Sequence, residues 1–458
     1  MTVIRKSRIW SFFPEALLIL LCFGFCLAGA ILLPVSVCPD EPGRRAVSDW
    51  IFSHGSLPTG NERETIMAFW GFSYALRPYL SGIIAAFFMK IVSLISGAPV
   101  PMIVASRLGS VFAVTLCCFG CLRLGRRLFR KRGSAIFFAT AVCFTPQVMF
   151  LGMYQNNDSL ALVAVCMILN CFDECVENGW KIKSCIHLAV WLSVGLLSYY
   201  NTYGWILMCA LFFLIAVIRD RRIQRQGRLI LQRGSLMIGI CLILAGWFFI
   251  RNAIIHNGDF LGISSTFTLR NDPEYLKWLE SMNGSLYQFV NYRQAGMSVA
   301  EFLQFKNWEW VRMTWQSIIG VFGGMDLYMP LERYGIYGTL IVLGLFLFGG
   351  AVLHCRPEPR ARLLIRMMLF SSVITLLLHF WYSYGFDYQP QGRYIITVLL
   401  PVFFLIAWAF DKTDLHFRET DRKLRWFPAP AVIAAFVWVG LFILTFSDTM
   451  LRMIPGVY

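Results

Sequence analysis

Two adjacent carboxylates stand where the first long apolar run of the sequence ends. Asp40 and Glu41 lie between two prolines that restrict the backbone, and Arg44 and Arg45 follow within one helical turn. Adjacent acids of this kind bind a metal ion, or divide the roles of general base and orienting group. The alternative is a solvated pair at a helix start, with the two arginines as charge partners.

A third acid lies in another short polar stretch. Asp158 follows Asn157 at a boundary between two apolar runs. An ionisable side chain at the edge of a helix bundle is a candidate functional residue. Asp158 could equally cap the N-terminus of the following helix.

Two arginines occupy similar boundaries later in the chain. Arg251 closes an apolar run, and Arg393 precedes another, with Gln391, Gly392 and Tyr394 beside it. The planar guanidinium suits phosphate oxygens, and the glycine permits close backbone approach. The residues that we expect to bind substrate are Arg393, Arg251, Arg44, Gln391 and Tyr394. The alternatives are membrane-edge arginines and, for Arg251, a structural pair with an outer-loop acid.

These residues belong to a strongly apolar chain. Of its 458 residues, 57% are hydrophobic and only 15% are charged, with a net charge of +15. This composition excludes a cytosolic globular enzyme, a disordered chain and a fibrous one. The basic residues form short clusters between apolar runs, which is typical of membrane loops and argues against nucleic acid as a partner. Most cysteines lie within apolar runs, where we expect them to pack as small apolar residues.

The hydropathy pattern predicts an all-α, polytopic membrane protein. A membrane crossing needs about 20 apolar residues. Eleven runs qualify as spans: 13–36, 101–122, 134–153, 159–173, 185–201, 203–218, 235–254, 335–353, 363–383, 394–410 and 427–446. We expect all of them to form one integral-membrane domain, 1–458, with two large outer loops at 38–100 and 255–334.

The basic clusters fix the predicted orientation. They precede the first span and follow the second, fourth, sixth, eighth and tenth, so all of them fall on one side. Because short cytoplasmic loops are enriched in Lys and Arg, this side is predicted to be the cytoplasm, together with the N-terminus. The arrangement places both large loops outside the cell membrane.

Two apolar segments allow more than one interpretation. Residues 78–96 are apolar enough to cross, but a crossing would move the Arg-rich stretch 123–132 outside, so we predict an interfacial or re-entrant helix. The first span could be a signal peptide, but its apolar run is too long for one, which favours an uncleaved helix.

Several short motifs together resemble the GT-C glycosyltransferases, polytopic enzymes that use polyprenyl-phosphate sugars. The acidic pair after the first helix, the Gly-Ser-Leu-Pro at 55–58 and the Asn157–Asp158 pair are similar to that group. The same holds for the motifs ASRLGSVFAV, RNAIIHNGDFLG, WQSIIGVFGGM and QPQGRYIITVLLP, which resemble uncharacterised bacterial membrane proteins of this superfamily. The resemblance covers most of the membrane domain.

The chain also departs from this pattern. Many relatives have a histidine shortly after the acidic pair and a His-Pro-Pro-Leu before the next helix. Here those places hold Arg44 or Arg45, and the sequence Arg77-Pro78-Tyr79-Leu80. These differences leave the donor and the acceptor open.

The resemblance implies a role for each candidate residue. Asp40 would be the general base on the acceptor, Glu41 would orient it or join a cation site, and Asp158 would hold a metal or position the acceptor. Arg393 would bind the donor phosphate. The implied cofactor is a divalent cation, Mg²⁺ or Mn²⁺, and the implied partners are a polyprenyl-phosphate-linked sugar, a cell-envelope acceptor and membrane lipid.

Two other classes of protein compete with an inverting glycosyltransferase. A transporter or flippase of a lipid-linked substrate should carry ionisable groups near mid-membrane and broken helices in matched halves. The sequence has neither, because its acids gather at one outer face. A scaffold protein would need no convergent acidic site.

Overall fold

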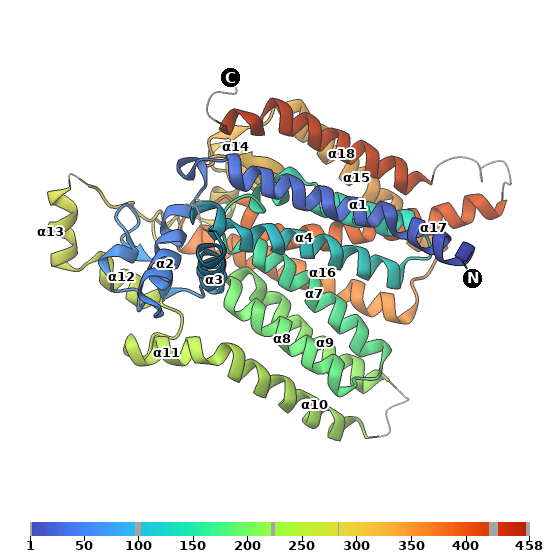
Figure 1. Cartoon of the computed structure of the whole chain (residues 1–458), viewed down its shortest axis with the longest axis horizontal. Helices are drawn as coiled ribbons and strands as arrows, with labels where there is room; N and C mark the ends of the chain where they lie inside the picture. The colour runs from blue at the N-terminus through green and yellow to red at the C-terminus, as the bar shows by residue number, and fades with distance from the viewer. Residues whose placement is uncertain (1, 97–101, 221–224, 283, 421–428, 455–458) are drawn as a thin grey trace.

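Long apolar helices form the body of the computed structural model, which describes residues 2–96, 102–220, 225–282, 284–420 and 429–454. Figure 1 shows most of these helices running along the long axis of the molecule. Within the described residues, nine segments are long and apolar enough to cross a membrane: Phe13–Leu32, Met102–Leu128, Asp158–Glu177, Tyr200–Arg219, Gln226–Ile255, Leu331–His354, Pro359–Gly385, Gly392–Thr413 and Pro430–Met453. The chain is therefore a multi-pass membrane protein.

The expected count of eleven crossings is not confirmed, because two of the predicted spans correspond to helices of 17 residues or fewer. The span at 134–153 divides into α5 (Arg132–Cys143) and α6 (Pro146–Leu151), and the span at 185–201 corresponds to the 17-residue helix α8 (Ile182–Ser198). The first break has a local cause: Thr145 precedes Pro146, and the residue before a proline avoids the helical conformation.

The remaining spans follow the hydropathy pattern. Their helices are α1 (Thr2–Leu32), α4 (Met102–Leu128), α7 (Asp158–Glu177), α9 (Tyr203–Arg219), α10 (Gln226–Cys241) continued by α11 (Trp247–Ile255), α15 (Leu331–His354), α16 (Pro359–Gly385), α17 (Leu399–Thr420) and α18 (Pro430–Asp448). The predicted spans that begin at 101 and 427 start outside the described residues.

Short elements make up the two large loops. The first loop holds α2 (Glu41–His54), the hairpin β1–β2 (Ile66–Met67 and Phe72–Ser73) and α3 (Leu80–Ile95); the second holds α12 (Ile263–Arg270), α13 (Pro273–Ser281), α14 (Val299–Gly320) and the hairpin β3–β4 (Val321–Phe322 and Leu327–Tyr328). Helix α14 is two helices, because residues 305–308 have non-helical backbone angles.

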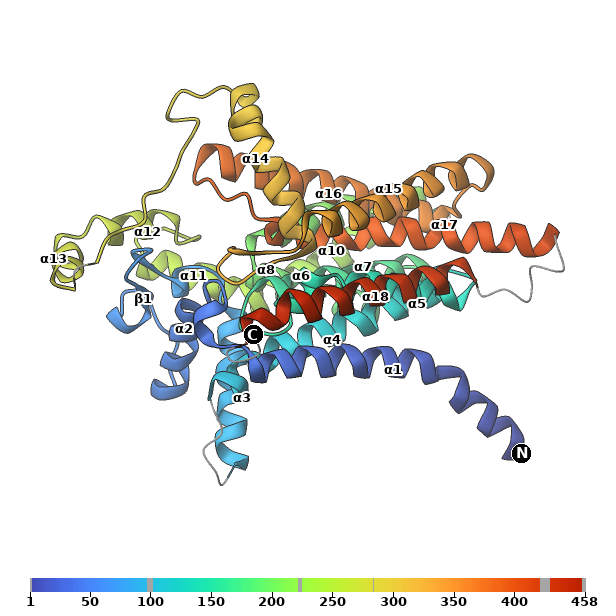
Figure 2. The ribbon, with the colours of Figure 1, turned by 90° about the horizontal axis from the view of Figure 1, so that it is seen from above.

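Helix α3 lies across the direction of the long helices. Figure 2 shows it nearly perpendicular to α1 and α4. With only 16 residues it is also short for a crossing. The Nζ atom of Lys90, in the middle of α3, lies 5.8 Å from the ring centroid of Phe52 on α2. This arrangement agrees with an interfacial helix at 78–96.

Ion pairs join the basic segments at one end of the bundle. Asp173 on α7 is fully buried and accepts from Arg127 of α4 at 2.7 Å and from Arg360 of α16 at 2.5 Å. At the same end Glu15 of α1 pairs with Arg132 of α5 at 3.0 Å. The basic clusters at 123–132 and 356–366 therefore lie together, as the charge pattern predicted. Five members of the other predicted clusters lie outside the described residues: Arg221, Arg222, Arg422, Lys423 and Arg425.

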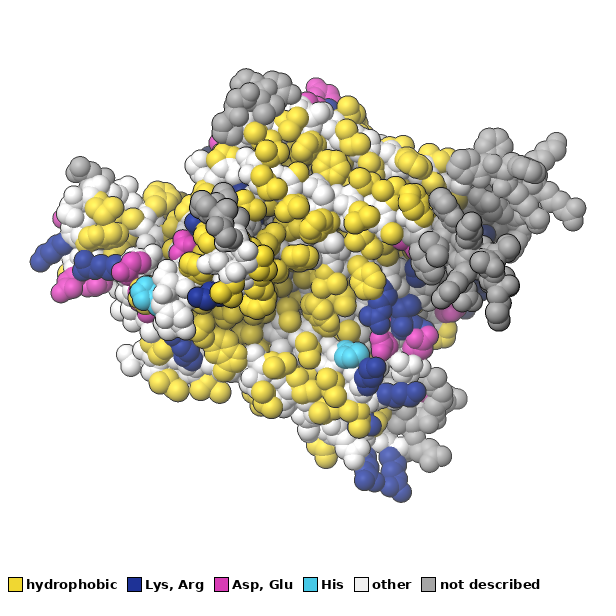
Figure 3. Space-filling view, in the orientation of Figure 1, with side chains coloured by type: hydrophobic (Ala, Val, Ile, Leu, Met, Phe, Trp, Pro, Cys, Tyr) yellow, Lys and Arg dark blue, Asp and Glu magenta, His cyan; other side chains and the backbone are white. Residues whose placement is uncertain are grey.

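The two large loops lie at the opposite end of the molecule. Figure 1 shows α2, α12 and α13 there, while α1 begins at the basic end. Figure 3 shows hydrophobic side chains over the middle of the visible face and charged ones mainly towards its two ends. Helix α7 is buried along most of its length in the centre of the bundle. Its first residue, Asp158, is thereby held against the loop end.

Candidate active site

The turn after α1 sets Asp40 in an uncommon conformation. Asp40 precedes α2 with φ at 60°, in the left-handed region that few non-glycine residues adopt. Its side chain makes no capping bond to the helix. Its Oδ2 atom instead accepts from Arg393 Nη2 at 2.6 Å and lies 3.8 Å from Arg44 Nη2. The predicted base thus faces two guanidinium groups.

Arg393 is held in place by a close contact between η6 (Gly392–Val398) and α14. A Cβ atom on Gly392 would lie 2.2 Å from the backbone nitrogen of Ile318 and 2.4 Å from the carbonyl oxygen of Thr314. Only glycine fits this approach, as the sequence indicated. The Nε and Nη1 atoms of Arg393 are buried and have no hydrogen-bond partner within the described chain.

Arg44 approaches Asp40 from the first turn of α2. Its guanidinium carbon lies 4.9 Å from the ring centroid of Tyr74 and 5.7 Å from that of Tyr199. The side chain is only 3% exposed, and its Nε and Nη1 atoms lack partners among the described residues. Stacking on aromatic rings stabilises the cation but satisfies no N–H group. Arg44 therefore also has hydrogen-bonding capacity to offer a ligand.

Asp158 adds a second buried carboxylate to the cluster of Asp40, Arg393 and Arg44. It is fully buried at the start of α7, and neither of its oxygens accepts a hydrogen bond from another described residue. The capping alternative therefore does not account for this side chain. Burial lowers the pKa of Arg44, but Tyr74, Asp40 and Asp158 raise it, with a net upward shift. The charge of Asp158 thus acts on the same guanidinium as that of Asp40.

Opposing effects act on the pKa of Asp40. Burial raises this pKa, whereas the charges of Arg393 and Arg44 lower it, and the result lies below the ordinary value of an aspartate. Asp40 is therefore ionised at neutral pH, as a general base must be. Buried N–H groups without partners beside two carboxylates can bind an anion and remove a proton from a neighbouring hydroxyl.

Glu41 has a different environment from Asp40. Its Oε1 and Oε2 atoms accept from Arg107 Nε at 2.8 Å and Arg107 Nη2 at 2.5 Å, and Oε1 also accepts from the backbone N–H of Gln155 at 2.9 Å. Glu41 and Arg107 are both fully buried. Both carboxylate oxygens are thus already bonded within the protein.

The predicted metal ligands do not form a set of three in the part of the chain that the structure describes. There, the groups of three side chains that could hold a metal are Cys22, Cys118 and Cys143, and Cys117, Cys121 and Cys166. Neither Glu41 nor Asp158 belongs to such a group. Asp158 offers free oxygens, but those of Glu41 are occupied by Arg107. The arrangement does not fit a cation held between Glu41 and Asp158.

Arg251 contacts the backbone of the first large loop. Its Nη2 atom donates to the carbonyl oxygens of Leu57 and Pro58 at 2.9 and 3.0 Å, so it holds the first outer loop. The alternative of a structural pair predicted an acid as its partner, but Nη2 binds backbone carbonyls instead. Its Nη1 atom is buried without a partner among the described residues.

Tyr394 and Gln391 flank Arg393. The hydroxyl of Tyr394 lies 3.4 Å from Arg393 Nη2, and its ring stacks on Tyr199 with a centroid distance of 6.0 Å. Gln391 donates to Gln389 at 2.6 Å, and its own Oε1 atom is buried without a partner in the described chain.

Sequence reasoning assigned no role to several residues that shape this site. Tyr74 and Tyr199 stack on Arg44, while Arg107 and Gln155 bind Glu41. Arg77 packs 4.6 Å from the ring centroid of Phe72 and forms no ion pair with a described carboxylate. A buried arginine in an apolar helix, such as Arg107 in α4, was the one sequence signal for this group.

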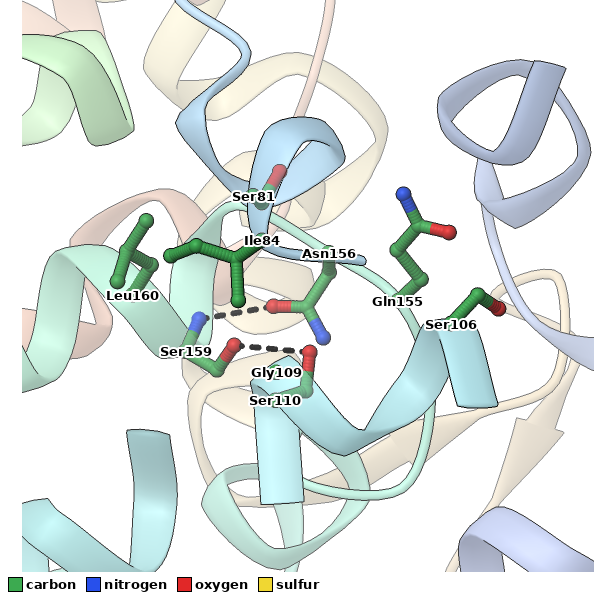
Figure 4. Close-up of a pocket in the computed structure, with 9 residues that line it drawn as sticks. All are labelled: Ser81, Ile84, Ser106, Gly109, Ser110, Gln155, Asn156, Ser159 and Leu160. Carbon is green, nitrogen blue, oxygen red and sulfur yellow. Dashed lines mark hydrogen bonds between the residues drawn. The ribbon is translucent and has the colours of Figure 1, made fainter. Parts of the chain in front are cut away.

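A small hollow adjoins the acid cluster. It is lined by Ser81, Ile84, Ser106, Gly109, Ser110, Gln155, Asn156, Ser159 and Leu160. Figure 4 shows serine hydroxyls of α3 and α4 around it, with Ser159 and Ser110 hydrogen-bonded. None of the four residues Asp40, Arg44, Asp158 and Arg393 lines it. These four meet through direct contacts and through their charges.

Comparison with known protein families gives one match. Residues 78–253, less than half of the chain, match the family described as dolichyl-phosphate-mannose-protein mannosyltransferase. No curated protein sequence matches the chain.

Solved structures extend the likeness to nearly the whole chain. ArnT from Cupriavidus metallidurans bound to undecaprenyl phosphate has a TM-score of 0.54 and 13% identity, covering 97% of this chain and 74% of its own. The oligosaccharyltransferase AglB from Archaeoglobus fulgidus, in complex with an inhibitory peptide and a dolichol-phosphate, has a TM-score of 0.53 and 10% identity, covering 95% and 55%. The mycobacterial arabinofuranosyltransferase AftD has a TM-score of 0.52 and 14% identity, covering 97% and 28%. Residues 78–253 are therefore similar to a family of membrane mannosyltransferases, and the chain as a whole shares the fold of these glycosyltransferases.

Proposed function

We propose that this protein transfers a sugar from a polyprenyl-phosphate donor to a cell-envelope acceptor, on the extracytoplasmic side of the cell membrane. The observation that carries the proposal is the pair of buried arginines, Arg44 and Arg393, which both lie beside Asp40 and keep N–H groups without partners in the described chain. The ligands of two structural neighbours, undecaprenyl phosphate and dolichol-phosphate, support a lipid-linked donor.

The reaction is a single displacement. The acceptor hydroxyl gives its proton to Asp40 as its oxygen bonds to the anomeric carbon. The bond from that carbon to the phosphate oxygen breaks, and its electron pair leaves with the polyprenyl phosphate. Attack opposite to the leaving group inverts the anomeric carbon. Arg393 and Arg44 stabilise the negative charge that develops on the phosphate, and Asp158 positions the acceptor.

The sidedness of the proposal rests on charge. The basic clusters at 123–132 and 356–366 lie at the end opposite to Asp40 (Figure 1), joined by ion pairs such as those of Asp173 with Arg127 and Arg360. Cytoplasmic loops are the ones enriched in Lys and Arg. The N-terminus is therefore assigned to the cytoplasm and the acids to the outer face, where a lipid-linked sugar reaches them from the bilayer.

The test is transfer of radiolabelled sugar from a polyprenyl-phosphate donor to cell-envelope fractions by the purified protein, with and without EDTA. Asp40→Asn should abolish transfer while leaving the protein folded. Asp49→Asn is the matched control, because Asp49 lies on α2, the helix that follows Asp40, and is half exposed in an ion pair with Arg45.

The outcomes separate this function from its alternative. Normal turnover by Asp40→Asn would remove the base assignment. Movement of the donor between leaflets of a vesicle, without a new glycosidic bond, would indicate a flippase. A loss of activity in EDTA that Mg²⁺ or Mn²⁺ restores would establish a cation requirement; a neighbouring oligosaccharyltransferase was solved in complex with Zn and sulfate.

A further inference from the structure

Glu41 connects the two loops that carry the candidate acids. It follows Asp40 directly, and its Oε1 atom accepts from the backbone N–H of Gln155 at 2.9 Å. Gln155 lies in the short connection that leads into Asp158, the first residue of α7. This hydrogen bond therefore joins the Asp40 turn to the Asp158 turn across 114 positions of sequence.

The side chain of Gln155 reinforces the connection. Its Nε2 atom donates to Ser48 Oγ at 2.5 Å and to the carbonyl oxygen of Arg44 at 3.2 Å. Gln155 is 2% exposed and Ser48 is fully buried, so water does not compete for these bonds. The connection before α7 is thus attached to α2 at its first residue and over its next two turns.

Arg107 supplies the charge that Glu41 needs when buried. Besides its two bonds to Glu41, its Nη1 atom donates to the carbonyl oxygens of Ala30 and Leu33 at 3.0 and 2.6 Å, at the C-terminal end of α1. A buried carboxylate with a bidentate cation and an N–H donor is fully paired. Glu41 therefore has no free oxygen for proton transfer, and its charge is already neutralised.

We propose that Glu41 is a positioning residue that, with Arg107 and Gln155, sets the spacing between Asp40 and Asp158. This inference rests on the proposed function for its kinetic consequence, since the spacing matters only if both acids serve one reaction. A displacement of about 1 Å in a catalytic group can reduce turnover about a hundredfold. The fold supplies the rigidity: α1, α2, α4 and the connection before α7 meet at this one ion pair.

The experiment compares two double variants, of which one keeps and the other loses the hydrogen bond to Gln155. Both carry Arg107→Met, which removes the cation and fills its volume. The first adds Glu41→Gln, whose Oε1 atom still accepts from the Gln155 N–H, and the second adds Glu41→Ala, which accepts nothing. We expect kcat of the glutamine variant to exceed that of the alanine variant by about tenfold or more, with equal KM for the polyprenyl-phosphate sugar.

Hydrogen–deuterium exchange gives a readout that does not depend on activity. In the alanine variant the amide of Gln155 loses its acceptor, so exchange in the peptide covering 154–158 should be faster than in the glutamine variant. The single variant Gln155→Ala introduces no charge change and keeps the backbone N–H that binds Glu41. It removes the two side-chain bonds, so it should lower kcat while leaving the donor KM nearly unchanged.

Several results would overturn the positioning role. Equal kcat and equal exchange in the two double variants would show that the bond to Gln155 positions nothing. A higher Mg²⁺ or Mn²⁺ concentration for half-maximal activity in both double variants than in the wild type would identify Glu41 as a metal ligand instead. If the wild type itself transfers no sugar, the proposed function fails, and the exchange data still decide whether the connection exists.

Discussion

Arg393 and Asp40 lie 353 positions apart in the sequence, and their side chains meet at 2.6 Å through Nη2 and Oδ2. The contact uses one edge of the guanidinium and leaves Nε and Nη1 buried without a partner in the described chain. One arginine can therefore hold the proposed base and bind a phosphate at the same time. This geometry couples the ionisation of Asp40 to the presence of Arg393.

The first prediction concerns the acid limb of the pH–rate profile. The carboxylate is active when deprotonated, and Arg393 and Arg44 hold the pKa of Asp40 below the ordinary value of about 3.9 against the opposing effect of burial. Activity should therefore persist as pH falls to about 4 and be lost only below it. In Arg393→Gln the pKa of Asp40 rises, so the acid limb of kcat/KM should move to higher pH.

The control for this shift is Arg45→Gln. Arg45 pairs with Asp49 at 3.3 Å on the same helix and does not contact Asp40. Its acid limb should coincide with that of the wild type. An unchanged limb in Arg393→Gln would mean that another group sets the profile.

The second prediction concerns donor affinity. Arg44 stacks on Tyr74 and Tyr199 and has two unpartnered nitrogen atoms. Since a hydrogen bond to a charged group contributes about 1.5–3 kcal/mol, Arg44→Gln should weaken binding of the polyprenyl-phosphate sugar about tenfold to a hundredfold. Equilibrium binding and KM measure this loss. If Arg45→Gln weakens binding equally, a general charge effect and not a specific contact is responsible.

The third prediction tests the close approach at Gly392. A Cβ atom there would collide with the backbone of Ile318 and Thr314 on α14, so Gly392→Ala must displace η6 or α14. We expect lower thermal stability and a loss of transfer, because Arg393 follows directly. Gly440→Ala is the control, since a Cβ atom on Gly440 would meet no atom within 4 Å. Equal behaviour of the two variants would contradict the steric argument.

The fourth prediction concerns the opposite end of the bundle. Asp173 is fully buried and pairs with Arg127 and Arg360, which are about a quarter exposed. Asp173→Asn leaves both arginines without their charge partner and should destabilise the protein by about 1–3 kcal/mol, less than a fully buried pair because solvent screens the cations.

Thermal unfolding in detergent measures this destabilisation, and kcat below the transition should be unchanged. Glu358→Gln, in the exposed pair with Arg130 at 3.7 Å, should leave the melting temperature as it is. A large loss of kcat in Asp173→Asn would instead connect this end of the bundle to catalysis.

The sequence predicted the membrane architecture because hydropathy and charge act locally. An apolar run of sufficient length is a helix in a bilayer wherever it occurs, and basic loops mark one side. The same local reasoning marked Asp40, Asp158 and Arg393, which are polar residues at helix ends where the membrane alone does not require them. It missed the break before Pro146, which divides the predicted span at 134–153 into two shorter helices.

The sequence alone therefore determined which residue types stand at the loop end of an all-α membrane protein. Only the tertiary structure decided their partners: Asp40 faces Arg393 and Arg44, Glu41 turns to Arg107, and Arg251 binds the carbonyls of the first outer loop. The physical reason is that an ion pair depends on distance in space, and helix packing sets that distance for residues hundreds of positions apart. Adjacent carboxylates such as Asp40 and Glu41 look alike in sequence. The fold places Asp40 beside two arginines that keep unpartnered N–H groups, whereas both oxygens of Glu41 are bonded to Arg107.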